Sequence, residues 1–145
     1  MRDYRELARP SGLYESANGG RSARVAVLDS GIPSVKSILS YSSRNFTSGS
    51  ERDAEHSTFV GSLLFGRGDI IGICPEASAF FGNVFDGGVA RPETVARAID
   101  CAVSEWKADV INLSLGFSRS QDCPKTIRAA CERAAKNGVV LVAAS

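Results

Sequence analysis

The stretch PETVARAIDCAVSEWKADVINLSLG, residues 92–116, contains a helix pattern followed at once by a strand pattern. Pro92 is favoured in the first turn of a helix, and the apolar residues after it recur at helical spacing: Val95, Ile99, Ala102, Val103 and Trp106. The segment ADVINLSLG, residues 108–116, then predicts a strand. A helix that leads directly into an apolar strand is typical of the right-handed crossover between two parallel strands.

The same alternation extends upstream of this stretch. RVAVLD, residues 24–29, and ASAFFGNVFD, residues 77–86, predict strands, the second followed by a Gly-Gly turn. The apolar run FVGSLLFG, residues 59–66, predicts a short helix between them. The polar stretch at 40–56 predicts a loop.

Downstream, the pattern predicts one more helix and one more strand. We expect Asp122 to cap a helix just ahead of Pro124, and Gly138 to end it in a left-handed conformation. The buried stripe of this helix is predicted from its apolar spacing: Ile127, Cys131, Ala134 and Ala135. The segment VVLVAAS, residues 139–145, predicts the next strand.

Continuously apolar strands that alternate with helices predict an α/β fold of three layers, a mostly parallel sheet with helices on both faces. Residues 1–23 are polar and rich in Gly and Ser, which predicts a surface lead-in segment. The folded domain is therefore expected to cover residues 24–145.

Composition narrows the function. The 145 residues are 43% hydrophobic and 23% charged with a net charge of +1, which suits one globular domain. Without a basic stripe or a long apolar run, we expect neither nucleic acid nor a membrane as a partner. No apolar signal-peptide core is seen at the start, so we expect a cytoplasmic protein.

The metal-binding residue types are sparse. Four cysteines form no CxxC pair and the chain has one histidine, so no zinc site is expected. Cys101 and Cys131 lie on helical patterns, where we expect reduced, buried thiols, while Cys74 and Cys123 stay undecided.

Ligands of open α/β sheets bind at the carboxyl ends of the strands, so the residues that follow each strand are the first candidates. Asp29 ends one strand, and His56 precedes a predicted helix. A hydrogen bond between them would place Nδ1–H on the carboxylate and leave Nε2 free to accept a proton from a hydroxyl nucleophile. The alternatives are an aspartate that caps a turn and a histidine that only packs.

Four motifs in order resemble those of the subtilisin-like serine proteases, the subtilase family. VAVLDSGI (25–32) resembles the family's aspartate motif, and EHSTFVGS (55–62) is similar to the histidine motif H-G-T-H-V-A-G. GICPEA (72–77) and ADVINLSLG (108–116) resemble two further motifs. The resemblance implies a subtilisin-like serine endopeptidase in which Asp29 and His56 are catalytic. It also implies that Ser114, Leu115 and Gly116 bind an extended polypeptide substrate as an added strand.

The histidine motif departs from the family at three positions. Glu55 and Ser57 replace glycines on either side of the histidine, and Phe59 replaces the second histidine. Extra bulk so close to the imidazole could tilt it, so the sequence leaves open whether Glu55, Ser57 and Phe59 permit an active histidine.

Other family features are missing from the sequence. The G-T-S-M-A-type motif with the nucleophile does not occur, and the Gly-Asn that follows the last strand in relatives is absent. We therefore expect a truncated catalytic domain whose nucleophile and oxyanion asparagine are not in this chain, and which is inactive alone. The missing C-terminal half is a predicted partner. The resemblance also implies surface calcium, but no dense Asp/Asn loop specifies a site. With 28 residues before Asp29, we expect no inhibitory prodomain within this sequence.

Two other functions compete with this one. A non-catalytic pseudoprotease or fragment would bind extended peptide along 114–116, or pair with a partner chain. A phosphate or magnesium loop at LDSG, as in sugar kinases, would need a β-hairpin after the aspartate, whereas this chain has a polar loop and a helix there.

Overall fold

Five parallel strands form the main sheet of the protein. The computed structural model describes residues 2–3, 16–49, 53–116 and 123–144. The strand order is β3-β5-β2-β8-β9, and each neighbouring pair is parallel. From one edge to the other the strands are β3 (Ser42–Asn45), β5 (Ser78–Asn83), β2 (Arg24–Asp29), β8 (Val110–Leu113) and β9 (Val140–Ala143).

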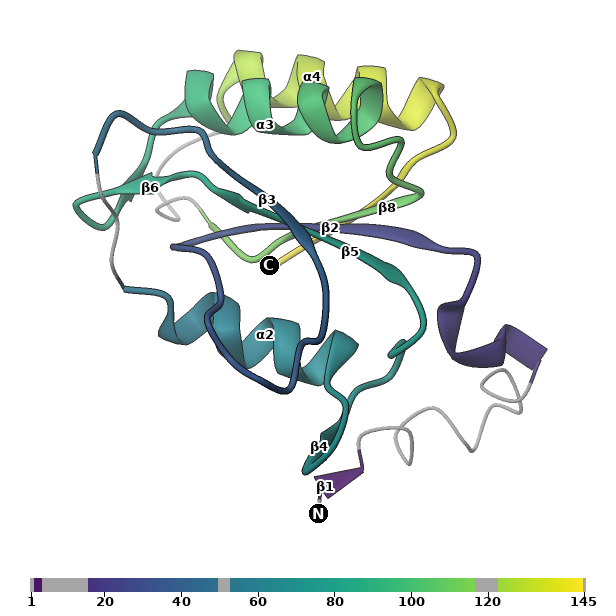
Figure 1. Cartoon of the computed structure of the whole chain (residues 1–145). Coiled ribbons are helices and arrows are strands. Elements are labelled where there is room, and N and C mark those ends of the chain that lie inside the picture. Colours follow the sequence, from purple (N-terminus) through teal and green to yellow (C-terminus); the bar gives the residue numbers. More distant parts are fainter. Residues whose placement is uncertain (1, 4–15, 50–52, 117–122, 145) are drawn as a thin grey trace.

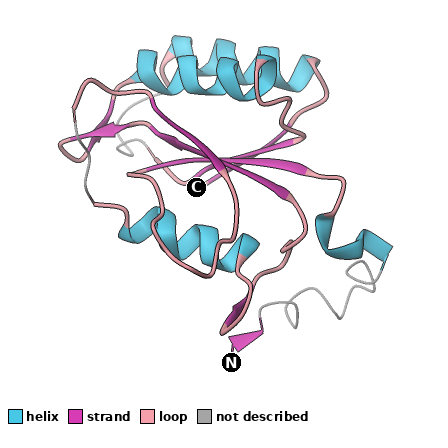
Figure 2. Ribbon diagram, viewed as in Figure 1, coloured by secondary structure: helices cyan, strands magenta, loops and turns pink. Residues whose placement is uncertain are grey.

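Helices cover both faces of this sheet. Helices α3 (Pro92–Ser104) and α4 (Lys125–Lys136) lie side by side on one face, and α2 (Glu55–Phe65) lies on the other (Figure 1). The ribbon view shows the same three layers of helix, sheet and helix (Figure 2). The predicted α/β architecture is therefore confirmed.

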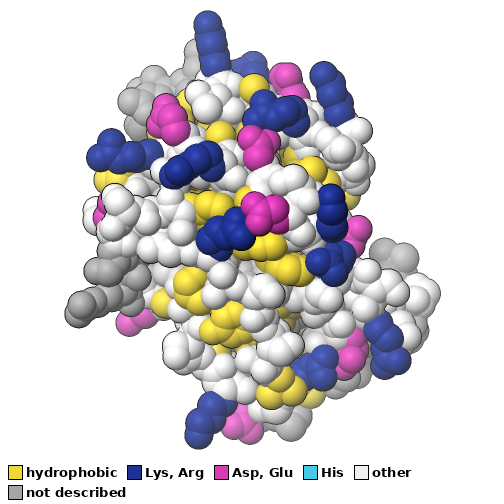
Figure 3. All heavy atoms as spheres, turned by 45° about the horizontal axis from the view of Figure 1, so that its top comes forward, with side chains coloured by type: hydrophobic (Ala, Val, Ile, Leu, Met, Phe, Trp, Pro, Cys, Tyr) yellow, Lys and Arg dark blue, Asp and Glu magenta, His cyan; other side chains and the backbone are white. Residues whose placement is uncertain are grey.

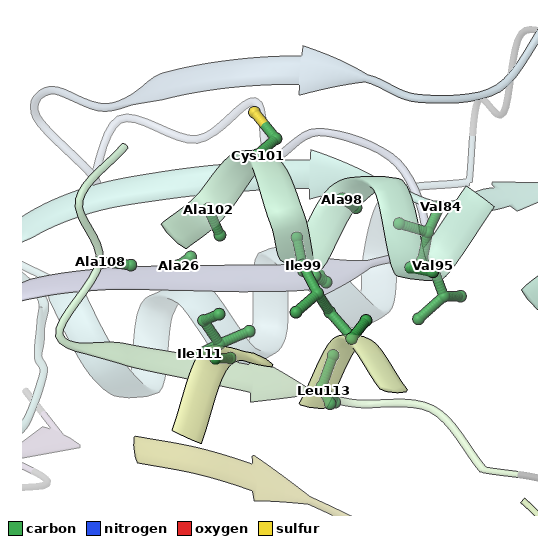
Figure 4. Packing of buried hydrophobic residues seen from close by; sticks show 14 of the residues in the cluster. Ala26, Val84, Val95, Ala98, Ile99, Cys101, Ala102, Ala108, Ile111 and Leu113 are labelled. Carbon is green, nitrogen blue, oxygen red and sulfur yellow. The ribbon is translucent and has the colours of Figure 1, made fainter. Parts of the chain in front are cut away.

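Strand β2 supplies side chains to both cores in alternation. Ala26 and Leu28 are fully buried in the cluster under α3 and α4, where Ile99 and Ile111 also pack (Figure 4). Val25 and Val27 belong to the second cluster, whose other members include residues of the α2 side: Ile38, Phe65, Ala79 and Phe81. Because side chains alternate along a strand, Asp29 follows Val25 and Val27 toward the α2 face.

Three small elements lie outside the main sheet. Strands β6 (Phe85–Asp86) and β7 (Val89–Ala90) form a hairpin whose turn residues, Gly87 and Gly88, both have positive φ angles. Strand β1 (Arg2–Asp3) pairs with β4 (Ile70–Ile71), and a short 3₁₀ turn spans Asn18–Gly20. The described part of residues 1–23 thus contains strand β1 and one 3₁₀ turn.

The structure corrects the sequence predictions at two places. Strand β3 lies within the polar stretch predicted as a loop, and all four of its residues are exposed. In α4, Ile127 and Ala134 are buried as expected, but Ala135 is exposed and Ala130 takes its place in the core. Ala135 lies at the rim of the apolar stripe, turned away from α3 by the helical period.

The predicted C-terminal end of α4 can be compared with the structure, whereas the predicted N-terminal cap cannot. Gly138 has a φ of 79°, which is the left-handed stop expected there. The residue before the first helical turn is Pro124. The predicted cap, Asp122, lies outside the described residues.

The surface over α3 and α4 carries both signs of charge. Lys and Arg side chains lie among Asp and Glu side chains on this face (Figure 3). Arg44 forms an ion pair with Glu105, and Arg133 forms one with Asp100. Within the described ranges, none of the helices is long and apolar enough to span a membrane.

Candidate active site

Asp29 and His56 lie in direct contact at the carboxyl end of β2. His56 Nδ1 is 2.9 Å from both carboxylate oxygens of Asp29. The carboxylate is nearly inaccessible at 2% exposure, while the imidazole is 58% exposed. The backbone N–H of Ser30 also donates to Asp29 Oδ1, at 2.6 Å. The hydrogen bond expected from the sequence between these two side chains is present.

The turn after β2 explains why the two side chains meet. Gly31 has a φ of 66°, which strains any residue with a side chain. A Cβ at this position would be 2.7 Å from the Asp53 carbonyl oxygen and 2.9 Å from Ala54 Cα. The turn therefore packs directly against the residues that precede α2. Since His56 is the second residue of that helix, the same contact places its imidazole over Asp29.

Two of the departures from the histidine motif have clear surroundings in the structure. Ser57 is fully buried, and its hydroxyl donates to the Ala54 carbonyl at 3.2 Å. Phe59 is 59% exposed and points away from the core. With these residues in place, His56 Nδ1 still contacts the carboxylate of Asp29.

Two hollows meet at the imidazole. The first, of about 420 Å³, is lined by His56, by Val60 of α2 and by the ends of two strands: Asn112–Gly116 and Val142–Ala144. The second, of about 430 Å³, is lined by His56 and by residues of four other segments: Asp29, Ser30, Asp53, Phe85, Gly87, Gly88 and Ser114. His56 and Ser114 belong to both, so the segment predicted to bind substrate lies beside the predicted catalytic histidine.

Ser114 is itself held in place by a neighbour on β8. Asn112 Nδ2 donates to Ser114 Oγ at 2.6 Å, and both residues line the first hollow. Leu115 is half-buried and Gly116 is exposed. Among the described residues, no atom lies within 4 Å of a Cβ built at Gly116, so the backbone at this edge is open to a ligand.

The sequence analysis missed Asn83, the last residue of β5. It is 2% exposed, and its Oδ1 accepts hydrogen bonds from the backbone N–H groups of Gly31 and Phe85, each at 3.0 Å. Its Nδ2 donates to Asn45 Oδ1, also at 3.0 Å. The available signal was a polar amide inside the apolar run FFGNVF, since a buried amide requires hydrogen-bond partners.

The arrangement suits one kind of proton chemistry. With Nδ1–H donated to the buried carboxylate, the imidazole is fixed as the tautomer whose Nε2 accepts a proton. Because the ring is more than half exposed and faces both hollows, Nε2 is accessible to a group bound there. A bound hydroxyl nucleophile could therefore transfer its proton to His56.

No calcium ligands can be assigned. Nowhere in the described part of the chain do three Asp, Glu, His or Cys side chains gather as a metal site would require. The four thiols are free, and Cys101 is buried as expected, whereas Cys131 is half-buried and Cys123 exposed. Burial raises the pKa of the half-buried Cys74 to about 11.

Two bacterial proteases illustrate the similarity of this chain to known proteins. Subtilisin E of Bacillus subtilis (strain 168) is 28% identical over 142 residues, which cover 92% of this chain and 36% of subtilisin E. A thermostable alkaline protease of Halalkalibacterium halodurans is 32% identical over 133 residues, which cover 87% of this chain and 36% of that protease. The chain thus spans about a third of the length of the curated relatives it matches.

Solved structures share the fold. The prenylagaramide maturation protease PagA superposes with a TM-score of 0.73 at 23% identity, covering 92% of this chain and 49% of PagA. The patellamide maturation protease PatA superposes with a TM-score of 0.69 at 25% identity, covering 85% of this chain and 48% of PatA. The family model described as the subtilase family, peptidase S8, matches residues 20–145. The chain therefore belongs to the subtilase family of serine proteases.

Proposed function

We propose that this chain supplies the aspartate and histidine of a subtilisin-type serine endopeptidase site, with Asp29 as the orienting carboxylate and His56 as the general base. The observation that carries the proposal is the 2.9 Å contact of His56 Nδ1 with the carboxylate of Asp29. A buried carboxylate can both hold the imidazole in one tautomer and stabilise the imidazolium that forms during acyl transfer.

The proposed substrate is a polypeptide in an extended conformation that lies along 114–116. These residues continue β8 beyond its last sheet pair, at Leu113, and line the first hollow beside His56. An extended peptide can add to such an edge through main-chain hydrogen bonds, while its side chains enter the hollows. The open space at Gly116 favours close approach of a peptide backbone.

We further propose that the nucleophilic serine and the oxyanion asparagine come from sequence outside these 145 residues. Two nearby serines are poor substitutes, because the Ser57 hydroxyl is buried on Ala54 and Ser114 Oγ accepts from Asn112. In subtilisin, loss of the nucleophile costs roughly 10⁶-fold in turnover and loss of an oxyanion-hole donor roughly 10²–10³-fold. The isolated chain is accordingly inactive.

A chromogenic peptide assay tests these proposals. Residues 1–145 alone should release no chromophore above background, whereas a longer form of the protein that carries Gly-Asn and Gly-Thr-Ser-x-Ala segments should cleave the peptide. His56→Ala should abolish that cleavage, and Phe59→Ala, which changes an exposed residue of the same helix, should retain it. Cleavage by the 145-residue chain that is lost in His56→Ala would overturn the inactivity. Peptide binding without cleavage in the longer form would instead favour a pseudoprotease.

A further inference from the structure

The amide of Asn83 connects three segments that surround the candidate site. Asn83 lies opposite Asp29 in the pairing of β5 with β2, at the end of both strands. Its Oδ1 accepts from Gly31 in the turn that follows Asp29, and from Phe85, which lines the second hollow. Its Nδ2 donates to Asn45 at the end of the edge strand β3.

The orientation of this amide follows from its partners. Two backbone N–H groups face the same atom of Asn83, and only an oxygen can accept from both. Asn45 Oδ1 also accepts from the backbone N–H of Thr47 at 3.0 Å, so it presents an acceptor to Asn83 Nδ2. Both amides are therefore fixed by backbone donors.

A buried amide with these contacts is hard to replace. The side chain of Asn83 is 2% exposed and its contact with the Gly31 N–H is buried, so water cannot take over that contact. If the acceptor were removed, the N–H groups of Gly31 and Phe85 would lose their partner, and a buried unpaired donor is costly. The turn would then adopt another conformation to satisfy Gly31.

The conformation of the 29–31 turn affects the distance between the side chains of Asp29 and His56. Gly31 packs against Asp53 and Ala54, the two residues before α2, closely enough that no Cβ fits. A shift of Gly31 would therefore change the distance between Asp29 at the start of the turn and His56 in the first turn of α2. Asn83 contacts neither the imidazole nor the carboxylate.

From these contacts we infer that Asn83 is a positioning residue of the site: it holds the 29–31 turn in the conformation that keeps Asp29 on Nδ1 of His56. The inference rests on the proposed function, because it assigns Asn83 a role in orienting the proposed general base. It adds a residue that lies on β5, outside the motifs that contain Asp29 and His56.

The tautomer of His56 provides a direct test, because this is the only histidine of the chain. Imidazole ¹⁵N chemical shifts, recorded on the full chain at a pH where the ring is neutral, distinguish Nδ1–H from Nε2–H. The wild type should show Nδ1–H as the dominant form. Asn83→Leu should lose this dominance, and amide exchange at Gly31 and Phe85 should become faster.

Two variants separate positioning from general stability. Asn83→Asp keeps an oxygen for both N–H groups and should retain the Nδ1–H form. Asn45→Ala removes the far partner at an exposed position, where water can replace it, and should also retain that form. If Asn83→Leu does not fold, Asn83→Ser decides in its place, because its shorter side chain withdraws the acceptor from Gly31 and Phe85 without adding apolar bulk.

The possible results are distinct. A folded Asn83→Leu or Asn83→Ser chain with Nδ1–H still dominant would overturn the role of Asn83 and leave the proposed function standing. Loss of the Nδ1–H form in Asn45→Ala to the same extent would also overturn it, because stability alone would then explain the change. A wild type without the Nδ1–H form would overturn both proposals together.

Discussion

Gly61 of α2 rests directly on Phe81 of β5. A Cβ at Gly61 would lie 2.8 Å from Phe81 Cζ and 2.8 Å from Ile38 Cδ1, closer than such atoms pack. The absence of a side chain therefore lets α2 approach the sheet. Because α2 begins one residue before His56, this approach sets the height of the imidazole above the strand ends.

Gly61→Ala is expected to lower the free energy of unfolding by about 1–3 kcal/mol, since overpacking forces α2 away from a close-packed core. Chemical denaturation followed by circular dichroism measures the change. Gly116→Ala serves as the control, because a Cβ there meets no atom of the described residues within 4 Å. Equal stabilities of the two variants would contradict the tight packing of α2 on Phe81.

Asp29→Asn should remove the carboxylate while preserving the shape of the site. In an active longer form of the protein we expect turnover to fall by roughly 10⁴-fold, since the amide no longer fixes the required tautomer or stabilises the imidazolium. Steady-state kinetics with a chromogenic peptide measure the loss, which should fall mainly on kcat. Thermal unfolding checks that the variant is folded. A folded variant with unchanged kcat would remove Asp29 from the mechanism.

We predict that the half-buried thiol of Cys74 makes the free energy of unfolding decrease at alkaline pH. Burial raises the pKa of this thiol from 9.0 to about 11, so the folded state disfavours the thiolate. A raised pKa gives stability that is fully present below pH 9 and is lost as pH rises toward 11. The expected contribution is about 3 kcal/mol. Denaturation at pH 8, 9, 10 and 11 should show a weaker pH dependence for Cys74→Ala than for the wild type.

Cys123→Ala provides the matched control for this measurement, because Cys123 is exposed. It should follow the wild-type pH dependence. If Cys74→Ala and the wild type lose the same stability between pH 9 and 11, the thiol of Cys74 is not the group that responds.

The apolar pattern predicted the central elements because burial decides them. Strands β2 and β8 and helix α3 bury most of the residues expected from their periodicity, while Val103 is only half-buried. Strand β3 could not be found this way, because Ser42–Asn45 is polar and exposed. It is a strand through its pairing with β5 and through Arg44, whose two terminal nitrogens donate to Glu105, the residue after α3, at 3.0 and 2.8 Å.

Some residues of the candidate site were likewise predicted from the sequence, and one was not. Asp29 and His56 were predicted because a strand end and a helix start are visible in the sequence, and the motif resemblance assigned them a chemistry. Asn83 was not predicted, because two of its partners, Gly31 and Asn45, lie 52 and 38 residues away in the sequence and meet it only in the folded chain. Its amide is chemically unremarkable until the fold places two backbone donors on one oxygen.

Strand β9 offers a test of register at the edge of the described sheet. Val140 is 57% exposed, whereas its neighbour Leu141 is partly buried against the core under α3 and α4 and pairs with Ile111. Val140→Lys should leave the thermal unfolding midpoint unchanged and reduce self-association, since it adds a charge to an exposed apolar edge. Leu141→Lys should unfold the chain or lower the midpoint strongly, because it brings a charge against the core. Circular dichroism and sedimentation velocity measure the two effects. A one-residue slip of β9 exchanges its faces, so the opposite ranking of the two variants would show that β9 pairs with β8 in another register.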